Sequence, residues 1–274
     1  MKLSEMKQIL TERHLKLTKS LGQNFLHDGN QLRRIVEAAE LTPTDQVLEI
    51  GPGLGPLTEL LIKKAGAVIA IEKDDRLAGL LRERFSGSTN LTLINADALD
   101  HLRHPKNDWS DWKLVANLPY SVASPILVEL AQASGRPRRM VATVQLEVAR
   151  RLMAGPGQDD YGVLTLLIQL HYETRGWFKI PATCFYPAPD VDSACVTLVR
   201  RERPLLNHEQ TETFQRIVKR GFSQRRKMMF KLLKEDWPQE QLSRAFEALK
   251  LPQSIRAEAV SLQTFADLTR HRNP

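Results

Sequence analysis

Short apolar runs separated by amphipathic stretches make up most of the first two hundred residues. The runs with the length and composition of strands are 46–50, 68–71, 91–94, 114–116, 140–144, 176–180 and 194–199. Stretches with apolar residues at the three- and four-residue steps of a helix lie between them, at 57–64, 76–85 and 122–133. This alternation predicts an α/β fold with a mainly parallel sheet covered on both faces. The last two runs predict a hairpin at one edge of that sheet.

The pattern becomes purely helical after Arg200. Helical spacing of apolar residues recurs at 213–220, 227–234, 239–249 and 264–269. With a linker over 200–207, we predict a large domain at 1–203 and a small α-helical domain at 204–274. A short basic helix is expected within 1–17, which has neither the apolar core of a signal peptide nor the composition of a transit peptide.

A glycine-rich loop, Gly51-Pro52-Gly53-Leu54-Gly55, follows the first strand and precedes a helix. Glycines in this position permit a tight turn and let a ligand approach the backbone closely. Glu72 lies 21 residues beyond Gly51 at the end of the second strand. A carboxylate there can accept hydrogen bonds from both hydroxyls of a ribose. These features indicate a nucleoside cofactor, without separating NAD from S-adenosylmethionine.

The segment Asn117-Leu118-Pro119-Tyr120 follows the fourth strand, at the sheet edge where open α/β folds bind ligands. An aromatic amine such as adenine N6 is a poor nucleophile because its lone pair is delocalised into the ring. The Asn117 side-chain carbonyl and the Leu118 backbone carbonyl can accept from such an amine and stabilise the positive charge that develops on it. Pro119 fixes the turn, and Tyr120 offers a ring on which an extruded base can stack.

Two further residues have two interpretations each. Asp97, after the third strand, can accept from the exocyclic amine of an adenine, or it can simply cap a helix. Phe185, which begins the proline-rich segment 185–193, can close the base pocket opposite Tyr120, or it can anchor the core.

Taken together, these motifs resemble the ribosomal RNA adenine dimethyltransferases, and among them the bacterial enzymes that modify small-subunit (16S) rRNA. The resemblance runs from Lys19 to Lys234, and the segments that carry it are 19–26, 49–53, 117–120, 185–193 and 224–227. There are two departures. Leu146 replaces the Lys that is common in the family, which puts one RNA contact in doubt, and Cys184 replaces the usual Ala.

The resemblance implies a Rossmann-like fold dependent on S-adenosylmethionine, with 1–203 as the catalytic domain and 204–274 as an RNA- or ribosome-binding domain. The implied catalytic residues are Asn117, Leu118, Pro119, Tyr120 and Phe185. Those implied for the cofactor are Asn24, Leu26 (through its backbone), Gly51, Gly53, Glu72, Asp97 and Asn117. Those expected to bind RNA are Arg216, Lys219, Arg220, Arg225, Arg226 and Lys227.

The implied reaction places four methyl groups on N6 of two adjacent adenosines, in the hairpin loop near the 3′ end of the rRNA in an immature 30S subunit. The enzyme would also serve as a checkpoint in subunit biogenesis.

The distribution of charge agrees with this division of labour. Of a net charge of +7, residues 201–274 carry +6, and the segment 216–234 holds eight basic residues and no acidic one. Such a segment is either a solvated helix face or a contact for a polyanion, with nucleic acid favoured over membrane. Cys184 and Cys195 occur without a matching set of histidines, so we expect no metal site and a reducing cytoplasm. No apolar run is long enough to span a membrane, and nothing in the pattern suggests an obligate dimer.

Three other functions fit part of the pattern. A large-subunit rRNA methyltransferase usually has Ile after the catalytic Asn, where this chain has Leu118. A non-catalytic RNA- or DNA-binding factor would have no need for the intact cofactor and catalytic positions. An NAD-dependent dehydrogenase accounts for the glycine loop but leaves the segment 117–120 and the basic C-terminal region unexplained.

Overall fold

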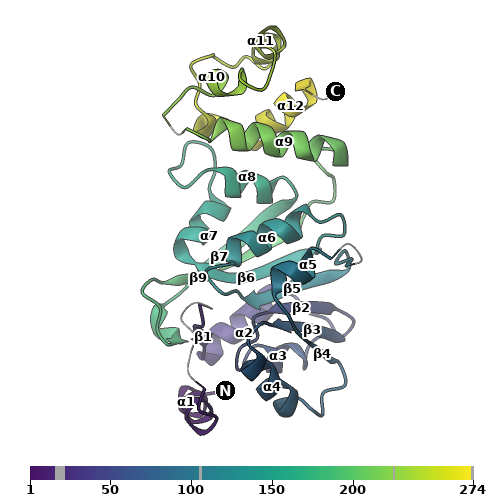
Figure 1. Ribbon diagram of the computed structural model, residues 1–274, viewed down its shortest axis with the longest axis vertical. Helices are drawn as coiled ribbons and strands as arrows, with labels where there is room; N and C mark the ends of the chain where they lie inside the picture. The colour runs from purple at the N-terminus through teal and green to yellow at the C-terminus, as the bar shows by residue number, and fades with distance from the viewer. Residues whose placement is uncertain (16–21, 105–106, 225, 273–274) are drawn as a thin grey trace. The chain divides into compact units, whose positions relative to one another are not determined.

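The largest element of the computed structural model is a seven-stranded sheet with strand order β4-β3-β2-β5-β6-β9-β7 (Figure 1). The structure describes residues 1–15, 22–104, 107–224 and 226–272. The strands of the large sheet are β2 (Gln46–Ile50), β3 (Ala67–Glu72), β4 (Leu91–Asn95), β5 (Trp112–Asn117), β6 (Arg139–Gln145), β7 (Tyr172–Ile180) and β9 (Ser193–Arg200). A second, two-stranded sheet pairs β1 (Phe25–Leu26) with β8 (Phe185–Tyr186).

The first five strands of the large sheet are parallel. Strand β2 pairs with β3 and β5, β3 pairs with β4, and β5 pairs with β6. Strand β9 joins β6 in antiparallel register, and β7 lies beyond it at the sheet edge. All seven predicted strands therefore form, and the last two occupy one edge as predicted. Because β2 to β5 run in the same direction, the segments that follow them meet at one edge of the sheet.

The helices are α1 (Leu3–Glu12), α2 (Gly29–Ala38), α3 (Thr58–Leu61), α4 (Asp75–Arg84), α5 (Ala98–Leu102), α6 (Ala123–Gln132), α7 (Leu146–Met153), α8 (Val163–Gln169), α9 (His208–Gly221), α10 (Met229–Leu233), α11 (Gln239–Ala248) and α12 (Leu262–Arg272). Two short 3₁₀ segments, η2 (Ala182–Cys184) and η3 (Ala257–Ala259), complete the described elements. Helix α2 was not predicted, although Asp28 caps its first turn and its buried residues Leu32, Ile35 and Val36 have helical spacing. Within the described residues, no helix is long and apolar enough to cross a membrane.

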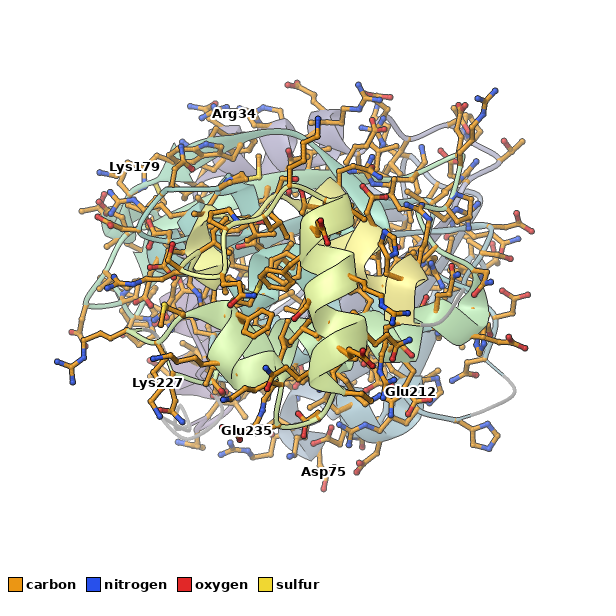
Figure 2. All side chains as sticks on the ribbon, turned by 90° about the horizontal axis from the view of Figure 1, so that it is seen from above. Arg34, Asp75, Lys179, Glu212, Lys227 and Glu235 are labelled. Atoms are coloured by element: carbon orange, nitrogen blue, oxygen red, sulfur yellow. The ribbon has the colours of Figure 1, made fainter. Side chains whose placement is uncertain are left out.

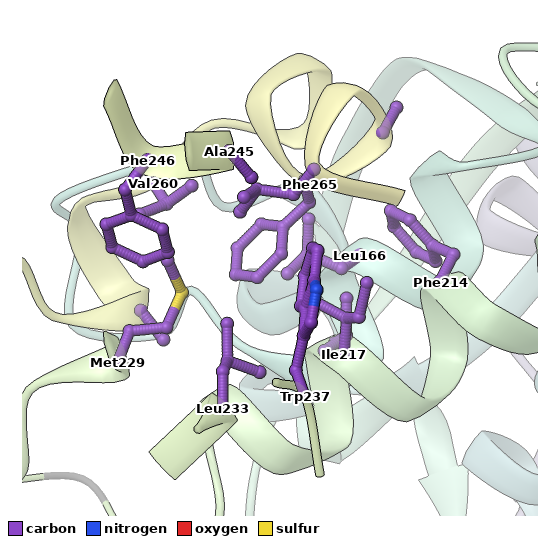
Figure 3. Close-up of a cluster of buried hydrophobic side chains, with 14 of the residues drawn as sticks. Leu166, Phe214, Ile217, Met229, Leu233, Trp237, Ala245, Phe246, Val260 and Phe265 are labelled. Atoms are coloured by element: carbon purple, nitrogen blue, oxygen red, sulfur yellow. The ribbon is translucent and has the colours of Figure 1, made fainter. Parts of the chain in front are cut away.

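The chain divides into two compact units, residues 1–149 with 174–200 and residues 150–173 with 201–274. This division differs from a single boundary at residues 203 and 204, because 150–173 packs with the C-terminal helices. Leu166 and Leu170, in and just after α8, share a buried cluster with Phe214 of α9 and Phe265 of α12 (Figure 3). An apolar stretch that precedes β7 in the sequence thus completes the core of the helical unit.

Candidate active site

A pocket opens at the sheet edge where the parallel strands end. Its lining includes nine of the residues singled out from the sequence: Asn24, Gly51, Gly53, Glu72, Asp97, Asn117, Leu118, Pro119 and Tyr120. These residues come from the segment before β1 and from the ends of β2, β3, β4 and β5. The tertiary structure therefore gathers residues spread over almost one hundred positions of sequence into one site.

The glycine loop after β2 has left-handed backbone at Gly51 (φ +69°) and Gly53 (φ +61°). A Cβ atom on Gly53 would lie 2.6 Å from Cε1 of Phe25, and one on Gly51 would lie 3.1 Å from Cγ of Pro119. The loop is thus packed against both the N-terminal segment and the predicted catalytic segment. Only glycine meets both the conformational and the steric demand at Gly53.

Glu72 forms a buried carboxylate wall of the pocket. One of its oxygens accepts from the Gly53 backbone N–H at 3.0 Å, and the other accepts from the Asp74 backbone N–H at 2.9 Å. Glu72 is only 6% exposed. Burial raises the pKa of Glu72, and the two backbone hydrogen bonds oppose that rise. Glu72 therefore links the glycine loop to the end of β3 and presents a fixed acceptor to the pocket.

Asp97 caps helix α5 and also lines the pocket. Its Oδ1 accepts from the Leu99 backbone N–H at 2.8 Å, and its Oδ2 pairs with Lys73 Nζ at 2.7 Å. The hydrogen bond from Lys73 is the main reason that the pKa of Asp97 is lowered. The capping interpretation is thus correct, and the same side chain is still placed where a ligand can reach it.

Asn117, the last residue of β5, is held in the pocket by a hydrogen bond from its side-chain amide nitrogen. Its Nδ2 donates to the Asn24 backbone carbonyl at 3.0 Å. Its Oδ1 is buried and has no hydrogen-bond partner among the described residues. A buried carbonyl without a donor is unfavourable, so this oxygen is suited to a donor that a ligand brings. The next residue, Leu118, donates its backbone N–H to Thr143 at 3.1 Å, which fixes the turn.

Tyr120 is half-buried at the mouth of the turn after β5. Its hydroxyl is hydrogen-bonded to Ser193 Oγ at the start of β9. Burial raises the pKa of Tyr120. The backbone of Tyr120 is fixed by the turn, and its hydroxyl is fixed by β9. The ring is therefore suited to serve as a rigid surface for a planar base.

Phe185 and Leu26 lie in the two-stranded sheet rather than in the pocket. They face each other in the β1–β8 register, and they are 3% and 2% exposed. Both belong to a buried cluster that includes Ile35 of α2 and Val141 of β6. Phe185 thus does not line this pocket, and its ring packs in the core, where its apolar area is removed from water. Its role opposite Tyr120 in a base pocket stays a prediction. Leu26 is likewise absent from the residues that line the pocket.

Glu49 is a buried acid that the sequence analysis did not single out. It is 1% exposed and accepts a hydrogen bond from Thr58 Oγ1 at 2.7 Å. Burial, with a smaller contribution from the charge of Glu72, raises the pKa of Glu49 to about 8. The signal that could have identified it is an acidic residue between Leu48 and Ile50 in a buried strand.

The predicted RNA-binding residues lie in two places in the second unit. Arg216, Lys219 and Arg220 of α9 line a cavity in that unit. Arg226 and Lys227 lie in the exposed turn before α10, where Figure 2 labels Lys227. Arg225 falls outside the described residues, as does the part of the N-terminal motif at 19–21. Among the described residues, no group of three or more His, Cys, Asp or Glu side chains is arranged to hold a metal ion.

Sequence comparison decides the family. The model of the ribosomal RNA adenine dimethylase family matches residues 14–271. The chain belongs to this family. It is 39% identical to the ribosomal RNA small subunit methyltransferase A of Latilactobacillus sakei, over 96% of this chain and 92% of that protein. It is also 39% identical to the protein of the same name from Geobacillus kaustophilus, over 98% of this chain and 95% of that protein.

Solved structures agree with the fold. A dimethyladenosine transferase from Plasmodium falciparum superposes with a TM-score of 0.76 at 26% identity, over 89% of this chain and 95% of the other. The 23S rRNA methyltransferase ErmE superposes with a TM-score of 0.69 at 30% identity, over 92% of this chain and 100% of the other. The predicted Rossmann-like methyltransferase fold is confirmed. The protein is an S-adenosylmethionine-dependent rRNA adenine methyltransferase.

Proposed function

We propose that this protein dimethylates N6 of two adjacent adenosines in the hairpin loop near the 3′ end of small-subunit (16S) rRNA, within the immature 30S subunit, and so takes part in subunit biogenesis. Its relatives at 39% identity are named small subunit methyltransferases, which supports the choice of subunit. We further propose that it acts in the cytoplasm as a monomer.

The pocket fits S-adenosylmethionine. Glu72 offers a fixed carboxylate acceptor for the ribose hydroxyls, and Asp97 lies where it can accept from the adenine amine. Gly51 and Gly53 leave room for close approach of the ligand to the backbone, and Asn24 also lines the pocket. When bound, this cofactor supplies an electrophilic methyl group on a sulfonium.

The observation that carries the proposal is the free side-chain oxygen of Asn117. The Asn24 carbonyl holds the amide nitrogen, so the amide is oriented with Oδ1 open to a donor from a ligand. Adenine N6 is such a donor. A hydrogen bond to Oδ1 orients the N6 lone pair and stabilises the positive charge that develops on this nitrogen during attack.

The remaining residues of the segment position the base. The Tyr120 ring, held through its hydroxyl by Ser193, provides a stacking surface for an adenine extruded from a hairpin loop. Pro119 packs beside Gly51 and holds the turn next to the glycine loop. A methylated, positively charged amine is acidic enough to lose its proton to water, so the chemistry requires alignment rather than a strong base.

Transfer of labelled methyl groups to immature small subunits tests the proposal. We expect dimethyladenosine in the wild-type reaction and a loss of about 10²–10³-fold in rate for Asn117→Ala, comparable to removing one preorganised hydrogen bond at a reacting centre. Asn30→Ala, an exposed asparagine on α2, is the matched control and should behave as wild type. Equal rates for Asn117→Ala and wild type would contradict the proposed role.

Large-subunit methylation is the second candidate, since ErmE is 30% identical over 92% of this chain. The relatives named for the small subunit are more similar, at 39%. The same assay on both purified ribosomal subunits separates the two. Methyl label found only in large-subunit RNA would show that the large subunit, and not the small subunit, is the substrate.

A further inference from the structure

A cavity within the second unit gathers positively charged side chains. Arg216, Lys219, Arg220 and Arg272 line it, with Asp236 as the one acidic side chain of the lining. Arg216, Lys219 and Arg220 project from one side of α9, because residues three and four apart on a helix are neighbours. An excess of positive charge around a hollow makes it a favourable place for an anion.

Two of these cations are available to a ligand. Arg220 is already held, by Asp236 at 3.1 Å and by Glu235. Among the described residues, in contrast, Lys219 has no ion pair, and Arg216 donates only to Thr213 Oγ1, at 3.3 Å. Arg216 and Lys219 are both exposed. Their charge is therefore largely uncompensated at the wall of the cavity.

The lining of the same cavity also includes Trp237, whose buried indole N–H has no acceptor among the described residues. Trp237 is 3% exposed and belongs to the cluster of Leu233, Ile217 and Phe265 (Figure 3). Its Nε1 has no hydrogen-bond partner among the described residues. An indole N–H can only donate, so an oxygen-bearing anion would satisfy it.

Arg272 covers this indole and is loosely held. Its guanidinium carbon lies 5.6 Å from the centroid of the Trp237 ring. Its two hydrogen bonds are long, 3.2 Å to Gln241 Oε1 and 3.4 Å to the Asp236 carbonyl. Arg272 can therefore exchange these partners for a stronger, charge-assisted one.

We propose that this cavity binds a phosphate group of the RNA backbone, with Arg216 and Lys219 as its first contacts and Arg272 and the Trp237 N–H completing the shell. That the polyanion is RNA rests on the proposed function. Arg226 and Lys227 do not line the cavity, and they add exposed positive charge in the turn before α10. Positive charge both at the cavity and in this turn suits an extended polyanion rather than a small free anion.

Binding of the full-length protein to immature small subunits at several salt concentrations tests the contact. Replacing both Arg216→Gln and Lys219→Gln should weaken binding about tenfold or more near physiological salt and reduce the slope of log K against log salt by about 1–2. Arg244→Gln, which removes an exposed charge from α11 in the same unit, is the matched control. Equal affinity and slope for the double variant and the control would overturn the proposal.

The indole N–H signals of the ¹⁵N-labelled protein provide a second readout, with the Trp237 signal assigned from Trp237→Phe. Inorganic pyrophosphate and a short single-stranded RNA should each shift the Trp237 signal in wild type and Arg244→Gln, and not in the double variant. An unmoved Trp237 signal, or a response to pyrophosphate without one to RNA, would overturn the proposal.

Cofactor titration and methyl transfer are measured in parallel. Absent methylation of small subunits by the wild type, with the Trp237 response intact, would contradict the proposed function and leave the phosphate site standing.

Discussion

At the scale of single residues, the site depends on carboxyl and amide groups whose partners are set by the backbone around them. Glu72 accepts from two backbone N–H groups, and Asn117 donates to a backbone carbonyl. These bonds fix the side chains before any ligand arrives. Preorganisation of this kind lowers the cost of ordering the site during binding and reaction.

Removing the Glu72 carboxylate should weaken cofactor binding more than it harms the fold. We expect Glu72→Ala to raise the dissociation constant for S-adenosylmethionine by roughly one to two orders of magnitude, because hydrogen bonds to charged groups contribute about 1.5–3 kcal/mol. Calorimetric titration measures this change. Glu83→Ala, an exposed acid on α4, should bind as wild type. An unchanged dissociation constant for Glu72→Ala would exclude Glu72 as a cofactor ligand.

Glu49 should make the folded protein less stable as the pH rises. Its pKa is raised from 4.5 to about 8 by burial, so the folded state keeps a proton that the unfolded state has lost. Between these values, the free energy of unfolding should fall by about 1.4 kcal/mol per pH unit on account of this group. Urea unfolding from pH 5 to 9 should show that Glu49→Gln gains stability over wild type across this window. A constant difference between the two proteins would mean that the Glu49 carboxyl is ionised when folded.

At the scale of elements, the hydrophobic pattern predicted strands better than helices. Each predicted strand is present, and the clearest runs belong to β2, β5 and β6, because buried strands of a mainly parallel sheet leave continuous apolar runs in the sequence. Helix α3 ends after four residues instead of spanning 57–64, and α5, α7 and α8 were not predicted. Short helices leave too few turns for a clear period, and their ends depend on capping and packing.

The glycine loop is the element in which a small change should have a large effect. Gly53→Ala adds a Cβ 2.6 Å from Phe25 at a backbone φ of +61°. We expect a loss of about 1–3 kcal/mol in stability together with weaker cofactor binding. Gly79→Ala in α4, where an added Cβ meets no atom within 4 Å, should instead stabilise the protein by about 0.5–1 kcal/mol. Thermal unfolding of both variants compares them, and equal stability would show that the loop relaxes around the methyl group.

At the scale of the whole molecule, the two units do not follow the order of the sequence. Residues 150–173 belong to the second unit, and the chain then returns to the first for 174–200. Tyr161, Leu166 and Leu170 are each at most 5% exposed. Their burial depends on the cluster that includes Phe214 and Phe265.

A fragment that ends at residue 203 should therefore be poorly soluble. It retains Tyr161, Leu166 and Leu170 but lacks the C-terminal helices that bury them, so we expect aggregation and binding of an apolar dye. Replacing both leucines in the fragment, Leu166→Ser and Leu170→Ser, should raise its soluble yield. A soluble, dye-negative fragment with the natural leucines would show that residues 1–203 form an independent domain.

The sequence by itself determined the succession of strands along the chain and the glycine loop. It also determined the candidates Glu72, Asp97 and Asn117, because strand periodicity and loop chemistry are local properties. Only the tertiary structure decided that Phe185 anchors the core, that Asn117 leaves one buried oxygen free, and that Trp237 and Arg272 join the basic face of α9. Burial and hydrogen-bond partners come from segments far apart in sequence, so no local pattern encodes them.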